Sequence, residues 1–268
     1  MKKLIAMILA LVMALSLVAC AGNNDEPAAD APAADAPVAD APAADEPVAD
    51  EPVADEPVAD EPAADEVTVM TYADYVAAEL DAEVVIDCYV QDHQSWWDNK
   101  ITVYAADADG AYFLYELACS EEDAAKLVPG TKIRVTGYKG EWAGEVEIMD
   151  GTFEFVEGDT YVAEPIDATE LLGTDELINY QNQLAAFKGM TVESISYKND
   201  EPGDDIYLTL GLNGASYDFC VEVYLTDTES DVYTTVGTLE VGDVVDVEGF
   251  LYWYEGVNPH ITAISVAG

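Results

Sequence analysis

The feature that most limits the fold of this chain is an eleven-residue pattern that occurs twice, at 128–138 and again 112 residues later at 240–250. In each copy a glycine precedes an alternation of apolar and polar residues, and another glycine follows seven residues later. The first glycine predicts a turn, and the second predicts a bend or bulge inside a strand. The matching glycines are Gly130, Gly137 and Gly144 in the first copy and Gly242, Gly249 and Gly256 in the second.

The elements around this pattern follow one order in both copies. In the first copy, Thr71 and Asp74 cap a helix, and Asp109-Gly110 forms a hairpin turn. The first copy predicts a helix at 71–80, strands at 83–91, 100–106 and 111–118, a short helix at 120–127, a strand from 132 and a last strand at 145–156. The second copy predicts a helix at 175–186, strands at 189–197, 205–211 and 216–225, a short helix or turn at 228–236, and strands at 243–252 and 259–266.

Three strands, a helix and two strands is the order of elements in the OB-fold, a five-stranded Greek-key barrel. In the segments 130–138 and 242–250, together with Phe187–Val192, the chain resembles the OB-fold modules of bacterial lipoproteins and exported proteins, including those called tRNA-anti-like. The resemblance implies a mainly β protein with two tandem OB-fold-like barrels, at 67–165 and 166–268. It carries no catalytic residues, because the shared motif consists of glycines and alternating apolar residues.

The N-terminus has the pattern of an export signal. Lys2 and Lys3 precede an apolar run over 4–18, which is short of the roughly 20 residues that a spanning helix needs. The run ends in Leu17-Val18-Ala19-Cys20, which resembles the lipobox of bacterial lipoproteins. The resemblance implies a signal peptide at 1–19, a lipid on Cys20 and a protein held outside the cytoplasm on the bacterial cell membrane. The alternative is an ordinary signal peptide with a cysteine at its cleavage site.

Between this anchor and the barrels, eight copies of the unit [Glu/Ala]-Pro-[Ala/Val]-Ala-Asp fill residues 26–65. Regular proline disfavours a helix, and the aspartates repel one another. We expect segment 20–66 to be a disordered, extended linker. At a rise of roughly 3.1 Å per residue, its repeats could span on the order of 120 Å.

Acidic residues dominate the predicted folded part as well. The chain has 55 Asp and Glu against 9 Lys and Arg, and residues 67–268 hold 40 of those acids and 7 of those bases. A field of this sign repels phosphate backbones, so nucleic acid is a disfavoured partner. Solubility is the simpler explanation for the many acidic residues, and binding of cations is the more specific one.

Three cysteines remain if Cys20 carries lipid, and an odd number cannot pair completely. Cys88 and Cys220 lie in apolar strand patterns, where a free cysteine is usually a small buried hydrophobe. A disulfide between Cys88 and Cys119 stays open. There is no Cys-x-x-Cys spacing, and the two histidines lie far apart in the sequence, so no local metal motif is expected.

OB-folds bind ligands on strands 2 and 3, between the loops that join strands 1 to 2 and strands 4 to 5. In the first copy these loops, 91–99 and 139–144, contain three of the four tryptophans. Their rings could stack on bases or sugars, or could instead close the barrel end as a local core. The candidate ligand-binding residues are His93, Trp96, Trp97, Tyr138, Trp142, Trp253 and Tyr254.

The loop between strands 1 and 2 of the second copy, 199–205, is acidic rather than aromatic. Carboxylates and carbonyls are the ligands that calcium prefers, although the loop lacks the EF-hand spacing and an acidic surface turn is the more common meaning. The candidate calcium ligands are Asp200, Glu201, Asp204 and Asp205. No other cofactor is expected.

The sequence contains no recognisable nucleophile with its partner and no phosphate-binding loop, so an enzyme is not expected. The leading hypothesis is a binding module for an uncharged or cationic ligand, such as a glycan, a peptide or a small molecule. One alternative is a structural or protein-interaction component of the cell envelope. The other is nucleic-acid binding by analogy of fold, which the charge opposes.

Overall fold

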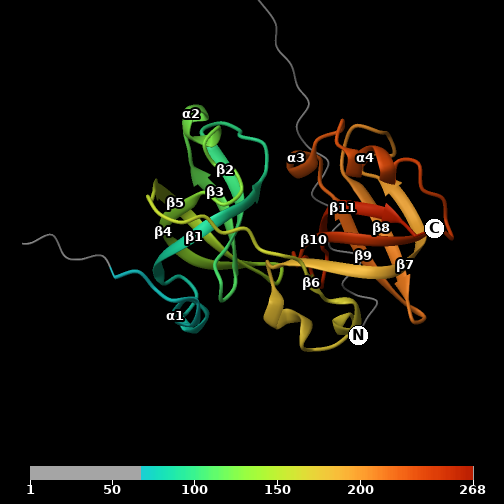
Figure 1. Ribbon diagram of the computed structural model, residues 1–268, viewed down its shortest axis with the longest axis horizontal. Coiled ribbons are helices and arrows are strands. Elements are labelled where there is room, and N and C mark those ends of the chain that lie inside the picture. Colours follow the sequence, from blue (N-terminus) through green and yellow to red (C-terminus); the bar gives the residue numbers. More distant parts are fainter. Residues whose placement is uncertain (1–67, 268) are drawn as a thin grey trace, which may run out of the picture. The chain divides into compact units, whose positions relative to one another are not determined.

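The computed structural model describes residues 68–267, which contain two β-barrels (Figure 1). The predicted signal peptide at 1–19, the lipid site Cys20 and the repeat linker to residue 66 lie outside the described residues. None of the helices within 68–267 has the length and apolarity needed to cross a membrane.

The first barrel closes in the strand order β1-β2-β3-β5-β4, in which β3 and β5 run parallel and the other neighbours run antiparallel. This is the OB-fold topology, as the order of elements predicted. Its apolar core contains alternate residues of the strands, such as Val84, Ile86 and Cys88 of β1. The elements are α1 (Tyr72–Ala77), β1 (Glu83–His93), β2 (Lys100–Ala106), β3 (Ala111–Ala118), α2 (Glu121–Ala124), β4 (Lys132–Trp142) and β5 (Glu145–Phe155).

The second barrel repeats the same cyclic order as β7-β8-β9-β11-β10, because β10 pairs with both β11 and β7. The short strand β6 is added in parallel beside β7. The mainly β fold class with two tandem five-stranded barrels is therefore confirmed. The elements are β6 (Ile166–Asp167), η1 (Thr169–Leu171), η2 (Leu177–Tyr180), β7 (Leu184–Tyr197), β8 (Ile206–Leu212), β9 (Ala215–Val221), α3 (Val223–Thr226), α4 (Asp231–Val236), β10 (Val244–Phe250) and β11 (His260–Val266).

The helix predicted at 175–186 is wrong. Only a 3₁₀ turn, η2, forms there, and β7 already begins at Leu184. Asn182 has a left-handed backbone with φ of 69°, which ends the turn. The last residues of the predicted helix, 184–186, belong to β7 instead, where Ala185 is a core residue and the strand pairs with β10.

Other differences are smaller. The helix at 71–80 ends at Ala77, and the strand predicted to reach 225 ends at Val221, where α3 follows. The helix expected by analogy within 228–236 is confirmed as α4, and Ser230 caps it by accepting a hydrogen bond from the Tyr233 amide.

The two equivalent glycines, Gly137 and Gly249, lie at strand irregularities, as the pattern predicted. A Cβ at Gly137 would lie 2.9 Å from the Met149 carbonyl oxygen, and one at Gly249 would meet the His260 carbonyl group. Glycine is required at both positions because another strand's backbone passes so close to them.

The barrels share an apolar cluster of their own, apart from the two barrel cores. Tyr104 of β2 and Phe113 of β3 pack with Phe250 of β10, and the rings of Tyr104 and Phe250 stack with centroids 4.3 Å apart. Tyr104 and Phe113 lie on the outward face of strands 2 and 3, which is where OB-folds usually bind their ligands. In the first barrel the second barrel covers part of that face.

Cys88, Cys119 and Cys220 are all free and buried. The disulfide between Cys88 and Cys119 that the sequence left open is therefore not formed. Both cysteines belong to the core cluster of the first barrel.

Candidate ligand-binding clefts

The outward face of β8 and β9 forms a cleft with a volume of about 560 Å³, which we call the second-barrel cleft. A volume of this size is in the range of small-molecule sites. Its outward-facing strand residues alternate with core residues: Tyr207 and Thr209 line the cleft, whereas Ile206 and Leu210 are buried in the barrel. The period-2 pattern of β8 therefore creates both the core and the floor of the cleft.

Aromatic side chains from both barrels wall this cleft. Trp142, at the end of β4 in the first barrel, packs against Tyr254, which follows β10 in the second barrel, with centroids 5.2 Å apart and planes at 39°. We call these two residues the aromatic pair. Their exposed fractions are 54% and 51%, so both rings keep surface available for a ligand. The neighbouring Tyr252 stacks on His260 with centroids 4.3 Å apart.

Hydroxyl groups and a carboxylate form the cleft floor. The Ser194 hydroxyl donates to Thr209 Oγ1 at 2.9 Å, and the Thr209 hydroxyl donates to Asp218 Oδ1 at 3.1 Å. These donors and acceptors form one chain across β7, β8 and β9, which polarises its members. A ligand that carries hydroxyl groups could exchange hydrogen bonds with such a chain.

A polar cluster lies where the cleft reaches the first barrel. His260 Nδ1 lies 2.6 Å from the Tyr104 hydroxyl and 3.3 Å from Glu222 Oε2. The Gln94 side-chain amide donates to both oxygens of Glu222, at 2.8 and 2.9 Å. Cys220 also lines the cleft, and burial raises the pKa of its thiol, which opposes the thiolate that a nucleophile requires.

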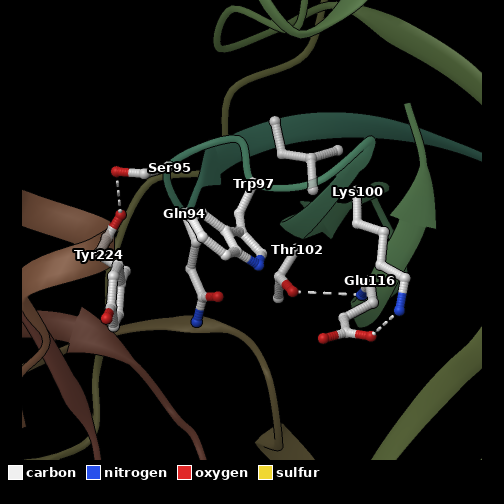
Figure 2. A pocket seen from close by; sticks show the side chains of 8 residues that line it. Gln94, Ser95, Trp97, Lys100, Thr102, Glu116 and Tyr224 are labelled. Carbon is white, nitrogen blue, oxygen red and sulfur yellow. Dashed lines mark hydrogen bonds and ion pairs between the residues drawn. The ribbon is translucent and has the colours of Figure 1, made fainter. Parts of the chain in front are cut away.

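A smaller cleft of about 330 Å³ lies on β2 and β3 of the first barrel, and we call it the first-barrel cleft (Figure 2). Trp97, which is 77% exposed, lies beside Gln94 and Thr102, and Tyr224 of α3 approaches from the second barrel. Lys100 pairs with Glu116 at 2.6 Å. The Glu116 amide donates to Thr102 Oγ1, and Glu116 has a left-handed φ of 48° at an irregular point of β3.

The sequence-predicted residues divide between several places. Trp97 lines the first-barrel cleft, and Trp142 and Tyr254 line the second-barrel cleft. Trp96 packs against the first core and donates from Nε1 to the Cys119 carbonyl, and Trp253 packs against the second core. Neither His93 nor Tyr138 lines either cleft; His93 Nδ1 lies 2.8 Å from the Gln94 carbonyl oxygen.

Sequence reasoning missed most of the residues that line the two clefts, and it missed that the loop bearing Trp142 serves the other barrel. Alternation along β8 could have indicated Tyr207 and Thr209. Tyr224 and His260 have no local signal, because packing between the barrels brings them to the clefts. The missed residues that the site uses are Ser194, Tyr207, Thr209, Asp218, Glu222, Tyr224 and His260.

The acidic loop of the second barrel is organised around a lysine. Lys198 Nζ lies 2.9 Å from Asp205 Oδ2 and 3.7 Å from Asp204 Oδ1, and the other Asp205 oxygen accepts from the Val223 amide. Within residues 68–267 there is no group of three His, Cys, Asp or Glu side chains arranged to hold a metal ion. Calcium binding by Asp200, Glu201, Asp204 and Asp205 stays a prediction from sequence.

Every lysine and arginine of the described residues is already engaged within the chain. Six form ion pairs with carboxylates. The seventh, Lys139, is buried and donates to the carbonyls of Tyr75, Val76 and Ala78 at the end of α1. Among the described residues that line the second-barrel cleft, none is Lys or Arg.

No known protein family and no curated protein matches this chain. Solved structures with a similar fold include a murine DNA-binding protein bound to double-stranded DNA, with 11% identity over 68% of this chain and 94% of that chain and a TM-score of 0.34. The Ifi202 HINa domain in complex with 20bp dsDNA has 12% identity over 69% and 98%, with a TM-score of 0.34. An aspartyl tRNA synthetase from Entamoeba histolytica has 15% identity over 38% and 21%, with a TM-score of 0.28. Likenesses this distant carry no assignment of function.

Proposed function

We propose that this protein is an extracytoplasmic lipoprotein that binds a neutral or amine-bearing glycan in the second-barrel cleft, without catalysing a reaction on it. The observation that carries the proposal is the aromatic pair, Trp142 and Tyr254, which brings one predicted ligand loop from each barrel to the edge of a single cleft. Exposed aromatic faces stack on the apolar faces of sugar rings and bury large areas at little entropic cost.

The cleft floor suits the polar edge of a sugar. Ser194, Thr209 and Asp218 supply hydroxyl and carboxylate oxygens in one connected chain. Asp218 and Glu222 bring negative charge that no lysine or arginine lining the cleft offsets, so anionic sugars are disfavoured and an amine is tolerated.

Nucleic-acid binding is the alternative that the same experiment must address, because two of the solved structures above contain double-stranded DNA. A phosphate backbone is bound by lysine and arginine with release of counterions. All seven of these side chains in the described residues already have partners within the chain. The glycan is therefore the better-supported ligand.

A glycan array probed with the full chain tests the proposal, followed by titration of tryptophan fluorescence with each glycan that binds. Trp142→Ala should weaken binding by about fivefold to 150-fold, because stacking on an aromatic ring is worth about 1–3 kcal/mol. Trp97→Ala is the matched control, since Trp97 lines the other cleft. The affinity of this variant for the glycan should stay within about twofold of that of the unmodified chain.

Three outcomes contradict the proposal: an array with no binder, an equal loss in both variants, or tighter binding of an oligonucleotide than of any glycan at physiological salt. The lipid anchor is tested separately. Cys20→Ala should move the protein from the membrane fraction to the soluble fraction, and unchanged membrane attachment would overturn the lipoprotein assignment.

A further inference from the structure

The two loops that carry the aromatic pair are joined by hydrogen bonds between the barrels. In the first barrel's hairpin, the Ala143 carbonyl accepts from the Glu255 amide at 2.7 Å, and the Gly144 carbonyl accepts from the Gln181 side chain at 2.8 Å. The Val146 carbonyl accepts from the Asn182 side-chain nitrogen at 3.1 Å. We call this contact of 142–146 with 181–182 and 253–255 the loop junction.

Glu145 lies at the centre of the loop junction and has no exposed surface. Its Oε2 accepts from the Trp253 amide at 2.8 Å and from the Gln181 side chain at 3.3 Å. Its other oxygen, Oε1, has no hydrogen-bond partner, although the side chain of Asn182 is a neighbour of the carboxyl group.

Asn182 has the same deficit. Its nitrogen donates to Val146, but its Oδ1 is buried and without a partner. Within residues 68–267 only one further buried side-chain polar atom lacks a partner, the hydroxyl oxygen of Tyr75, which carries a proton of its own. Two neighbouring buried acceptors without a donor cost free energy, and an ionised Glu145 has no proton to offer.

One proton on Glu145 removes both deficits, because a neutral carboxylic acid can donate from Oε1 to Asn182 Oδ1 while Oε2 keeps its two donors. We propose that Glu145 is a positioning residue that holds the loop junction in its neutral form, by donating a hydrogen bond from Oε1 to Asn182 Oδ1. Through the junction it keeps Trp142 and Tyr254 together, and this consequence for ligand binding rests on the proposed function.

The titratable groups around Glu145 agree with a neutral acid. Burial raises the pKa of Glu145 to about 8, against the lowering effect of the Trp253 amide and of the nearby Asn182 and Gln181 side chains, and burial raises the pKa of Glu147 to about 7. Tyr75, Tyr104 and Tyr252 also face these carboxyls, and burial raises the pKa of each phenol. Lys139 donates to the carbonyls of α1 and forms no ion pair with Glu145.

The direction of the pH effect follows from this raised pKa. The closed junction binds the Glu145 proton more tightly than an opened junction does, in which the carboxyl would have an ordinary glutamate pKa. The contribution of Glu145 to closure is therefore fully present below about pH 4.5. As pH rises from there to about 8, the equilibrium constant for closure falls by up to tenfold per pH unit. Above about pH 8 the Glu145 contribution is constant.

Glu145→Gln keeps the shape of the side chain but removes its titration, since the amide nitrogen donates a hydrogen bond at every pH in place of the O–H group. We expect exchange of the Trp253 amide hydrogen, corrected for its intrinsic rate, to lose protection from pH 5 to pH 8 in the full chain. The slope should be clearly shallower in Glu145→Gln. Glu141→Gln, an exposed substitution on the same hairpin, should leave the slope unchanged.

A second measurement does not depend on junction opening. In the full chain with ¹³C-labelled glutamate carboxyls, the signal that disappears in Glu145→Gln should titrate above pH 6.5. In Asn182→Ala the neutral acid loses its acceptor, so the same signal should titrate at lower pH. A midpoint near pH 4.5 in the unmodified chain, or equal exchange slopes in the chain and in Glu145→Gln, would overturn the proposal.

These two readouts need no ligand, so they stand or fall independently of the proposed function. If the glycan array yields a binder, its affinity should fall between pH 6 and pH 9 in the unmodified chain and stay nearly constant in Glu145→Gln. An array without a binder contradicts the proposed function and leaves the proton assignment to the exchange and titration results.

Discussion

The two barrels use the same outward face of strands 2 and 3 for different purposes. In the first barrel that face carries Tyr104 and Phe113, which are buried against Phe250 of the second barrel. In the second barrel it carries Tyr207, Thr209 and Asp218, which line an open cleft. Two barrels of one fold therefore present different surfaces, a docking face in the first and a candidate binding face in the second.

The difference shows that the function of each copy depends on its outward residues and not on the repeated pattern. The repeated core residues build both barrels, whereas the residues that distinguish the two faces lie outside the repeated pattern: Tyr104 and Phe113 in one barrel, and Tyr207, Thr209 and Asp218 in the other. Tyr104 of β2 and Phe113 of β3 form the surface of the first barrel against which the second barrel packs. The corresponding face of the second barrel carries hydroxyl groups, among them those of Ser194 and Thr209, that could bind a polar ligand.

The largest expected effect comes from breaking the docking face. Phe250→Ala removes a buried ring that stacks on Tyr104, and it should lower the free energy of unfolding by about 3–5 kcal/mol in chemical denaturation. Tyr207→Ala is the control on the open face, where a ring that is 42% exposed should cost under about 1 kcal/mol. Similar losses in both variants would contradict the contrast between the two faces.

Much of the fold could be predicted from the sequence, because alternating apolar residues report strands that are buried on one side. This pattern located all five strands of the first barrel and the bulges at Gly137 and Gly249. It failed at 175–186, where a short apolar run fits a helix or a strand equally well. Pairing of β7 with β10, a long-range contact, places residues 184–186 in the strand, and only the 3₁₀ turn η2 forms before them.

The candidate site was predictable only in part. The sequence identified Trp142 and Tyr254 as loop aromatics, but nothing local indicates that they pack together across two barrels. Trp96 has the same local signature as Trp97, yet its indole nitrogen donates to a backbone carbonyl beside the core. Whether a loop tryptophan lines a cleft or fills a core depends on the chain that packs against it.

The equivalence of the two copies can be tested at their shared glycines. Gly249→Ala and Gly137→Ala each place a methyl group against the backbone of a neighbouring strand, and each should lower the free energy of unfolding by about 1–3 kcal/mol. The Gly249 variant should lose more, because its methyl group would meet the His260 carbonyl, which is closer. Denaturation of both proteins beside Glu248→Ala, an exposed neighbour, measures the effect. A Gly137 variant as stable as the control would mean that the copies differ at this bulge.

The smallest expected effect concerns the polar edge of the docking face. Tyr104→Phe keeps the stacked ring but removes the hydroxyl that lies 2.6 Å from His260 Nδ1, so the free energy of unfolding should fall by about 1 kcal/mol. Burial, with a smaller contribution from Glu222, holds the pKa of Tyr104 well above its usual range. The phenol therefore stays neutral from pH 6 to pH 9. Titration of Tyr104 should therefore change the free energy of unfolding lost in Tyr104→Phe very little over that interval.

Tyr207→Phe is the matched control, because its ring lies on the open face of the second barrel. Chemical denaturation should give nearly equal stabilities for this variant and the unmodified chain. If Tyr207→Phe cost as much as Tyr104→Phe, the hydroxyl on the docking face would have no special part in joining the barrels. Their attachment would then rest on the apolar cluster of Tyr104, Phe113 and Phe250 and on the loop junction.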